Sequence, residues 1–242
     1  MCGRYSLTTE RHDLARELGL PLDAIPEDYA PRWNVAPSQS VAALRDRDQG
    51  IRFDWLQWGL LPDWVSDPSG ARRPINARSE SLAQKPSFRD SFRRRRCLIV
   101  ADGFYEWAPT PGRRTAKTPY FIHLKSNEPF TFAGLWSRWR GKTGDELHTC
   151  AIVTGEPNEL VAGVHDRMPV IVPRERREAW LDPEHQDPTT LAHLLQPLAA
   201  DLMTLHPVST HVNAPRNDDP ECVAPLPESG PPDDDRPLTL FD

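Results

Sequence analysis

The chain begins Met1-Cys2-Gly3-Arg4, and the cysteine at position two is its most reactive feature. Initiator methionine is commonly removed when the next residue is small, which would leave Cys2 with a free α-amine beside its thiol. Such a 1,2-aminothiol traps aldehydes, because the amine forms an imine and the sulfur then closes a five-membered thiazolidine ring. The ordinary pKa values of the two groups, about 7.7–8.0 and about 8.5, leave a reactive fraction of each near neutral pH. Position alone is also compatible with an ordinary residue of a first strand.

Asn76, Glu106 and His165 are polar residues in stretches that are otherwise apolar or turn-like. Capture of a sugar aldehyde needs a group that opens the sugar ring and protonates the departing hydroxyl. Glu106 lies between Tyr105 and Trp107, where partial burial would raise its pKa toward neutrality. His165 can exchange protons near neutral pH, and Asn76 can both donate and accept hydrogen bonds. The candidate catalytic residues are therefore Cys2, Asn76, Glu106 and His165.

The same four residue types also suit a cysteine hydrolase, in which His165 would be the base that activates the thiol. Each of the others has a purely structural interpretation as well. Glu106 can pair with an arginine at a strand edge, His165 can lie at a helix C-terminus, and Asn76 can form a turn. These residues alone do not separate aldehyde capture from hydrolysis.

The composition of the 242-residue chain limits its fold and its compartment. Its 26 prolines and 13 glycines favour many turns over a helical bundle. The four cysteines form no CxxC pair, so we expect no metal site, no disulfide framework and no cofactor. Such cysteines fit a reducing cytoplasm. No signal peptide and no stretch long enough to cross a bilayer is visible, so we expect no membrane association.

The charge is unevenly distributed along the chain. Residues 216–242 contain eight acidic and two basic residues and account for the whole formal charge of −6. Residues 71–96 contain nine basic and two acidic residues, including the run Arg93-Arg94-Arg95-Arg96. Concentrated basic charge beside aromatic residues indicates a surface for a polyanion. The alternative is that the arginine run is simply the solvated face of a helix.

Many short apolar stretches without regular βαβ alternation predict an α+β domain. We expect its core to be an antiparallel, partly barrel-like sheet flanked by short helices, over residues 2–215. The acidic, proline-rich residues 216–242 are expected to form a disordered tail. The apolar patterns predict strands over 2–7, 41–44, 51–58, 97–101, 104–107, 120–125, 130–138, 147–154, 168–172 and 204–209. They predict helices over 9–18, 87–95, 158–164, 174–181 and 189–195, and an ordered loop over 32–37.

Seven short motifs occur in one order along the chain, at residues 1–4, 33–37, 58–62, 76–80, 102–107, 165–169 and 206–209. Together they resemble the SRAP family, the SOS response-associated peptidases, from residue 2 to about residue 213. Seven ordered motifs are far more specific than any one short pattern.

The resemblance implies a protein that shields abasic sites in single-stranded DNA. Cys2 would form a thiazolidine with the C1′ aldehyde of the abasic sugar, and Glu106 would assist ring opening and proton transfer. His165 would steady the sugar oxygen and assist imine formation and crosslink reversal, and Asn76 would orient the reacting groups. The peptidase in the family name is compatible with self-removal of Met1. An N-terminal cysteine enzyme of this kind would have a lyase-like activity and a possible hydrolase activity.

We expect a DNA-binding surface around these residues. Arg4, Arg78 and Arg167 would meet phosphates by resemblance, and Lys85 would extend the groove, so binding should weaken with salt. Aromatic side chains can stack on bases. The full set of expected DNA contacts is Arg4, Asn34, Pro37, Trp64, Arg78, Lys85, Phe88, Trp107, Thr154 and Arg167. The alternatives are a cysteine peptidase that acts on proteins and a module that binds single strands without a covalent bond.

The chain ends in Pro237-Leu238-Thr239-Leu240-Phe241 after its acidic segment. This end resembles the short peptide by which many bacterial proteins dock on the replication sliding clamp, through Leu238, Leu240 and Phe241. An arbitrary apolar end is the alternative interpretation. We expect a monomer in the bacterial cytoplasm, associated with the nucleoid, whose partner is single-stranded DNA containing abasic sites.

Overall fold

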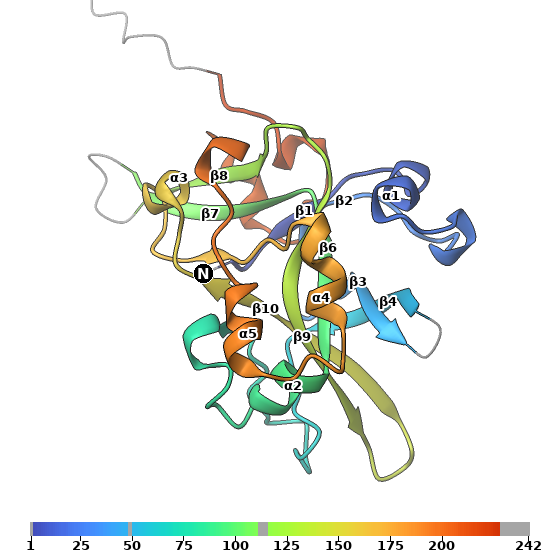
Figure 1. Cartoon of the computed structure of the whole chain (residues 1–242). Coiled ribbons are helices and arrows are strands. Elements are labelled where there is room, and N and C mark those ends of the chain that lie inside the picture. The colour runs from blue at the N-terminus through green and yellow to red at the C-terminus, as the bar shows by residue number, and fades with distance from the viewer. Residues whose placement is uncertain (1, 48–49, 111–115, 228–242) are drawn as a thin grey trace, which may run out of the picture.

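Five strands close into a barrel in the computed structural model, which describes residues 2–47, 50–110 and 116–227 (Figure 1). These strands are β3 (Ser40–Arg47), β4 (Gly50–Trp58), β6 (Arg96–Ala101), β9 (Phe130–Arg140) and β10 (Glu146–Gly155). Their order is β10-β4-β3-β6-β9, and β9 pairs back with β10 to complete the ring. The pairing of β10 with β4 is parallel, and the other barrel pairings are antiparallel. The predicted α+β class with a partly barrel-like sheet is confirmed.

The apolar run of β6 explains its central place in the barrel. Residues 97–101 are all fully buried, because both faces of this strand are covered. Strands that are buried on both faces have continuous apolar runs instead of alternating ones. Helix α4 (Arg177–Leu181) packs against β6 and crosses in front of it in Figure 1. The contact is fixed by Trp180, whose indole Nε1 donates to the carbonyl of Cys97 at 2.9 Å.

A second, antiparallel sheet has the strand order β12-β8-β7-β1-β2. It consists of β1 (Tyr5–Leu7), β2 (Arg32–Val35), β7 (Gly103–Pro109), β8 (Lys117–Leu124) and β12 (Met203–Pro207). The chain passes directly from β6 of the barrel into β7 of this sheet. Gly103 at this junction has no room for a side chain, because a Cβ there would lie 2.1 Å from the ring of Phe121. Within this sheet, β1 pairs with β2 on one side and with β7 on the other.

Two short strands extend the carboxyl end of β10. Strand β5 (Asn76–Arg78) runs parallel to residues 152–154, and β11 (Met168–Pro169) pairs antiparallel with residues 154–155. The segments that contain Asn76 and His165 are therefore anchored to the same end of one barrel strand.

Short helices connect and cover the strands. The remaining α-helices are α1 (Arg11–Leu18), α2 (Arg89–Arg94), α3 (Glu159–Ala162) and α5 (Pro188–His193). The 3-10 helices are Leu22–Ala24, Ser79–Ser81, Arg174–Arg176, Ala200–Leu202, Thr210–Asn213 and Pro220–Cys222. No helix within the described residues is both long enough and apolar enough to span a membrane.

Three details differ from the sequence-based expectations. The segment 32–37, expected as a loop, contains β2, because it pairs along β1. The strand expected over 168–172 is regular only over 168–169. Not every pairing is antiparallel, because both β4 and β5 run parallel to β10.

Residues 216–227 lie against the second sheet. Asp218 accepts hydrogen bonds from the backbone N–H of Trp33 at 2.6 Å and of Asn34 at 2.9 Å, and it also pairs with Arg32. Val208 forms a β-bridge with Pro225. The domain boundary that we expected at residue 215 thus falls inside a packed segment. The expected clamp-binding residues Leu238, Leu240 and Phe241 lie outside the described residues.

Candidate active site

Cys2 lies just ahead of β1, and its side chain is fully buried. Its Sγ donates to the carbonyl of Arg4 at 3.7 Å, and its own carbonyl accepts from Asn76 Nδ2 at 2.7 Å. Asn76 is the first residue of β5, so the pairing of β5 with β10 fixes its position. Burial raises the pKa of the Cys2 thiol far above its ordinary value, and the charge of Glu106 raises it further. The thiol is therefore protonated at neutral pH.

Glu106 is in the middle of β7, with its side chain only 3% exposed. Burial raises its pKa to about 7, the charge of Asp166 adds to this shift, and Lys117 opposes it. The direction of the shift and its cause, burial, agree with the expectation, but the two sequence neighbours of Glu106 do not bury it. Tyr105 and Trp107 pack in an apolar cluster on the other face of the sheet, because adjacent residues of a strand point in opposite directions.

His165 lies in the loop between α3 and β11, with its Nε2 3.8 Å from Glu106 Oε2. The backbone N–H of Arg167 donates to its Nδ1 at 3.0 Å, so a neutral ring carries its hydrogen on Nε2, which faces Glu106. Burial lowers the pKa of His165, which favours this neutral form. The carboxylate of Asp166, 2.9 Å from Nδ1, can pair with the ring only after protonation.

Arg167 is held by two neighbouring segments. Its guanidinium forms a bidentate pair with Glu80, at 2.5 and 2.8 Å, and donates to the carbonyl of Thr154 at 2.9 Å. Arg78 on β5 has an exposed side chain instead. Of these two arginines expected to meet phosphates, Arg78 presents its charge to solvent, whereas Arg167 is already engaged.

Two hollows share Arg78 as a lining residue. The first has a volume of about 540 Å³ and is lined by Arg78, Glu156, His165, Asp166 and Arg167. The second, of about 770 Å³, brings together five of the residues expected at the site: Trp64, Asn76, Arg78, Lys85 and Phe88. The predicted DNA-binding residues from the motif at 76–80 and from the basic segment after it are thus adjacent in space.

The aromatic candidates differ in exposure. Trp64 is 63% exposed, whereas Phe88 is 5% exposed and packs in the core. Trp107 is half-buried and donates from Nε1 to Asn213 Oδ1 at 2.8 Å. Pro37 is half-buried and lines neither hollow. Trp64 is therefore the best placed of the three aromatics to stack on a base.

Arg4 and Asn34 bind protein groups in this structure. Arg4 donates to Asn34 Oδ1 and to the carbonyl of Val212, both at 2.8 Å, and to the carbonyl of Asn213 at 3.0 Å. Asn34 is fully buried, and its Nδ2 donates to three carbonyls of residues 212–217. The geometry favours a positioning role for both residues, with Asn34 unable to touch DNA directly.

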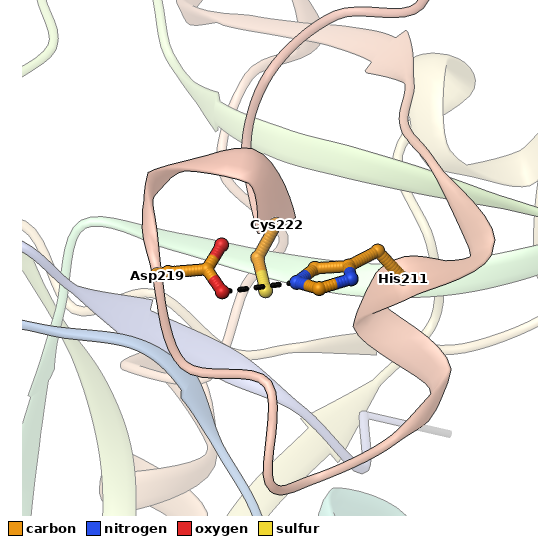
Figure 2. Close-up of side chains that lie close together, drawn as sticks. All are labelled: His211, Asp219 and Cys222. Atoms are coloured by element: carbon orange, nitrogen blue, oxygen red, sulfur yellow. Dashed lines mark hydrogen bonds and ion pairs between the residues drawn. The ribbon is translucent and has the colours of Figure 1, made fainter.

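Three side chains in or next to the 3-10 helices around this segment, His211, Asp219 and Cys222, lie close together (Figure 2). Potential metal ligands of His211, Asp219 and Cys222 lie within 4.8 Å of one another. Asn217 Nδ2 lies 3.1 Å from His211 Nδ1 and can only donate, so the ring hydrogen is on Nε2 and is donated to Asp219 at 2.9 Å (Figure 2). Cys222 Sγ donates to the carbonyl of Asn217 at 3.3 Å, so each of the three side chains already has a hydrogen-bond partner in the protein.

Asn76 Oδ1 and Thr154 Oγ1 are buried oxygen atoms that have no hydrogen-bond partner among the residues that the structure describes. Buried polar atoms are rarely left in this condition unless they serve a ligand or a water molecule. Both belong to the region where β5 meets β10, so they are candidates to bind polar atoms of a substrate.

Sequence reasoning missed Glu80, Lys117 and Asp218. Glu80 is part of the motif at residues 76–80, so the motif offered a signal for it. Lys117 influences the pKa of both Glu106 and His165. Lys117 lies in none of the seven motifs. Asp218 lies in the segment 216–242, which we expected to be disordered, so its sequence context gave no signal.

The fold and the site together define a protein with a buried cysteine at position two and a buried glutamate of raised pKa, at the junction of a barrel and an antiparallel sheet. The family model described as SOS response associated peptidase (SRAP) matches residues 1–215. The chain therefore belongs to the SRAP family.

Relatives in this family include proteins from bacteria and animals. The chain is 43% identical over 224 residues to the abasic site processing protein YoqW of Bacillus subtilis, covering 92% of this chain and 99% of that protein. It is 32% identical over 271 residues to the abasic site processing protein HMCES of Rattus norvegicus, covering 93% and 76% of the two chains. A crystal structure of a protein from Bacteroides thetaiotaomicron has a TM-score of 0.79 and 27% identity, covering 93% of this chain and all of the other.

Proposed function

We propose that this protein shields abasic sites in single-stranded DNA by forming a covalent thiazolidine between Cys2 and the ring-opened sugar. The observation that carries the proposal is the buried Glu106, whose pKa is about 7, whose Oε2 lies 3.8 Å from His165 Nε2, and whose charge acts on the thiol of Cys2. The relatives named abasic site processing proteins support the choice of substrate. Release of Met1, by another enzyme or by this one, would free the α-amine that the reaction needs.

The proposed reaction balances without a cofactor. The Cys2 amine adds to the C1′ aldehyde, and protonated Glu106 gives its proton to the resulting hydroxyl, which leaves as water. The Cys2 sulfur then attacks the imine carbon, and the Glu106 carboxylate takes the thiol proton, which restores the acid. A proton acceptor is needed at this step because burial keeps the thiol protonated.

Neighbouring groups can hold the sugar during these steps. The neutral His165 ring carries a hydrogen on Nε2 that can be donated to a sugar oxygen while Nδ1 stays bound to the backbone. Asn76 anchors the Cys2 carbonyl through Nδ2 and retains Oδ1 for a sugar hydroxyl. Thr154 Oγ1 can serve in the same way. An abasic nucleotide lacks stacking and pairing, so its entry into such a site costs little.

The DNA on either side of the abasic nucleotide would run along the two hollows that share Arg78. The exposed Arg78 and Lys85 would meet phosphates, and Trp64 would stack on a base. We further propose that the protein acts as a monomer near the bacterial nucleoid. In this proposal the acidic segment 216–242, whose residues 216–227 pack against the second sheet, ends in a clamp-binding peptide formed by Leu238, Leu240 and Phe241.

The cysteine-hydrolase alternative is less well supported. A hydrolytic cysteine acts as a thiolate, which requires a lowered pKa. The pKa of the Cys2 thiol is raised instead, because the side chain is buried and lies near the Glu106 carboxylate. Aldehyde capture tolerates this, because the amine reacts first and the thiol loses its proton only as the ring closes.

A denaturing gel tests the proposal. The protein is mixed with a labelled single strand that contains one abasic site, and an intact strand serves as the reference. We expect a slow-migrating, salt-resistant band only with the abasic strand, and no such band with Cys2→Ala. Cys222→Ala, which changes another buried cysteine, should leave the band in place. Equal bands from the Cys2→Ala variant, or turnover of peptide substrates without any band, would reject the proposal.

A further inference from the structure

We propose that Glu80 tunes DNA affinity by holding Arg167 in the free protein and releasing it to a backbone phosphate when a single strand binds. This inference rests on the proposed function only in assuming that the protein binds single-stranded DNA. It assigns Glu80 a role in specificity and does not make it a catalytic residue.

The first observation is that the Arg167–Glu80 pair occupies the atoms a phosphate would need. Both Nη atoms of Arg167 donate to the Glu80 carboxylate, in the planar bidentate geometry that guanidinium groups also use for phosphate. The Arg167 side chain is only 15% exposed in this arrangement. A phosphate can therefore gain a bidentate contact with Arg167 only by replacing Glu80.

The second observation is that the pair is suited to exchange. The Glu80 side chain is 51% exposed, so its carboxylate can move into solvent when it is displaced. Hydrogen bonding from Arg167 lowers the pKa of Glu80, which keeps it charged at neutral pH. The Nε of Arg167 is fully buried, so the exchange would involve the two Nη atoms that Glu80 occupies.

The third observation is that Arg167 borders the hollow where a strand would pass. This hollow of about 540 Å³ is also lined by Arg78 and His165. Glu80 thus keeps one cationic group neutralised beside the reacting histidine until a phosphate is presented. Breaking the Arg167–Glu80 pair offsets part of the binding free energy. An intact strand, which forms no covalent bond, is therefore bound more weakly than it would be without Glu80.

The test measures binding of an intact single strand, without an abasic site, by fluorescence anisotropy at several salt concentrations. Glu80→Gln should bind about two- to fivefold more tightly than the unchanged protein, the range expected for loss of a competing, partly exposed ion pair. The gain should vanish in an Arg167→Ala background, because the competition acts through that arginine. Glu156→Gln is the control, because it removes a charge from the same hollow that influences Arg167 without a hydrogen bond in the described structure. Its effect on affinity should be smaller than that of Glu80→Gln. It should not show the dependence on Arg167 expected for Glu80→Gln.

Unchanged or weaker binding by Glu80→Gln would overturn the inference, as would a gain that persists without Arg167. Lack of measurable binding by all variants would overturn it too. None of these outcomes bears on covalent capture, which the gel with the abasic strand reports separately.

Discussion

Oε2 of Glu106 lies 3.8 Å from Nε2 of His165, so a carboxyl group of raised pKa faces an imidazole of lowered pKa. Burial causes both shifts, because it disfavours the charged form of each group. The site therefore contains a carboxylic acid that can still be protonated near pH 7 and a neutral imidazole beside it. Pairs of titratable groups whose pKa values are moved in this way are typical of acid–base catalysis.

We expect Glu106→Gln to slow crosslink formation by about 100-fold or more, the usual contribution of a positioned acid–base group. In the unchanged protein the acid form of Glu106 is lost as pH rises through about 7, so the rate profile should contain an inflection there. The variant cannot titrate and should lack this inflection. Rates at saturating abasic strand, quenched between pH 5.5 and 8.5, provide the measurement. A variant with an unchanged profile would remove Glu106 from the mechanism.

Glu106 should also make stability depend on pH, independently of any reaction. Its folded pKa is about 7 against an ordinary value of 4.5, so its stabilising contribution is complete below pH 4.5 and is lost as pH rises through 7. At about 1.4 kcal/mol per unit, the loss is about 3 kcal/mol. Glu106→Gln should therefore melt higher relative to the unchanged protein at pH 8 than at pH 5, by about 5–10 °C. A constant difference across this range would contradict the burial argument.

Asn34→Ala should loosen residues 210–222. The change removes the four hydrogen bonds that Asn34 makes with Arg4 and with the carbonyls of Val212, Ala214 and Asn217, at a cost of about 2–4 kcal/mol. Faster amide hydrogen exchange in this segment and a lower melting temperature should result. Asn213→Ala removes a side chain that accepts one hydrogen bond, from Trp107 Nε1, within the described residues, and should cost less, about 1 kcal/mol. Equal losses of stability in the two variants would argue against Asn34 as the residue that contributes most to holding residues 210–222 in place.

Arg78→Ala should weaken binding of intact single strands and lower the slope of log affinity against log salt by about 0.7, the value for one phosphate contact on a single strand. Arg94→Ala is the matched control, because Arg94 is exposed on α2 and lines neither hollow. Its slope should stay the same. A larger change of the slope for Arg94→Ala than for Arg78→Ala would contradict this path and would indicate that the DNA contacts the arginine run at residues 93–96.

The sequence was sufficient for features that depend on local patterns. The hairpin of β3 and β4 follows from two apolar runs around a polar turn, and Gly19 ends α1 in the left-handed conformation that glycine favours. The roles of the four arginines at residues 93–96 could not be predicted in this way. Arg96 is 3% exposed and donates to backbone carbonyls at the end of α2 and around α4, so it is a structural residue and not part of a charged surface.

Contacts between distant segments could not be read from the sequence. Asn34 was expected at the DNA surface by resemblance, but its partners lie about 180 residues away in a stretch that looks like the start of a tail. Glu106 was expected to be buried by its sequence neighbours, which in fact point to the other face of the strand. Motifs show which residues matter together, whereas their hydrogen-bond partners depend on tertiary packing.

Mass spectrometry of the N-terminal peptide from the purified DNA adduct tests covalent capture by Cys2 most directly. The thiazolidine mechanism predicts that this peptide starts at Cys2 without Met1 and carries the sugar remnant on both its amine and its sulfur. A remnant on a lysine such as Lys85, or an adduct whose Met1 is still attached, would contradict the mechanism.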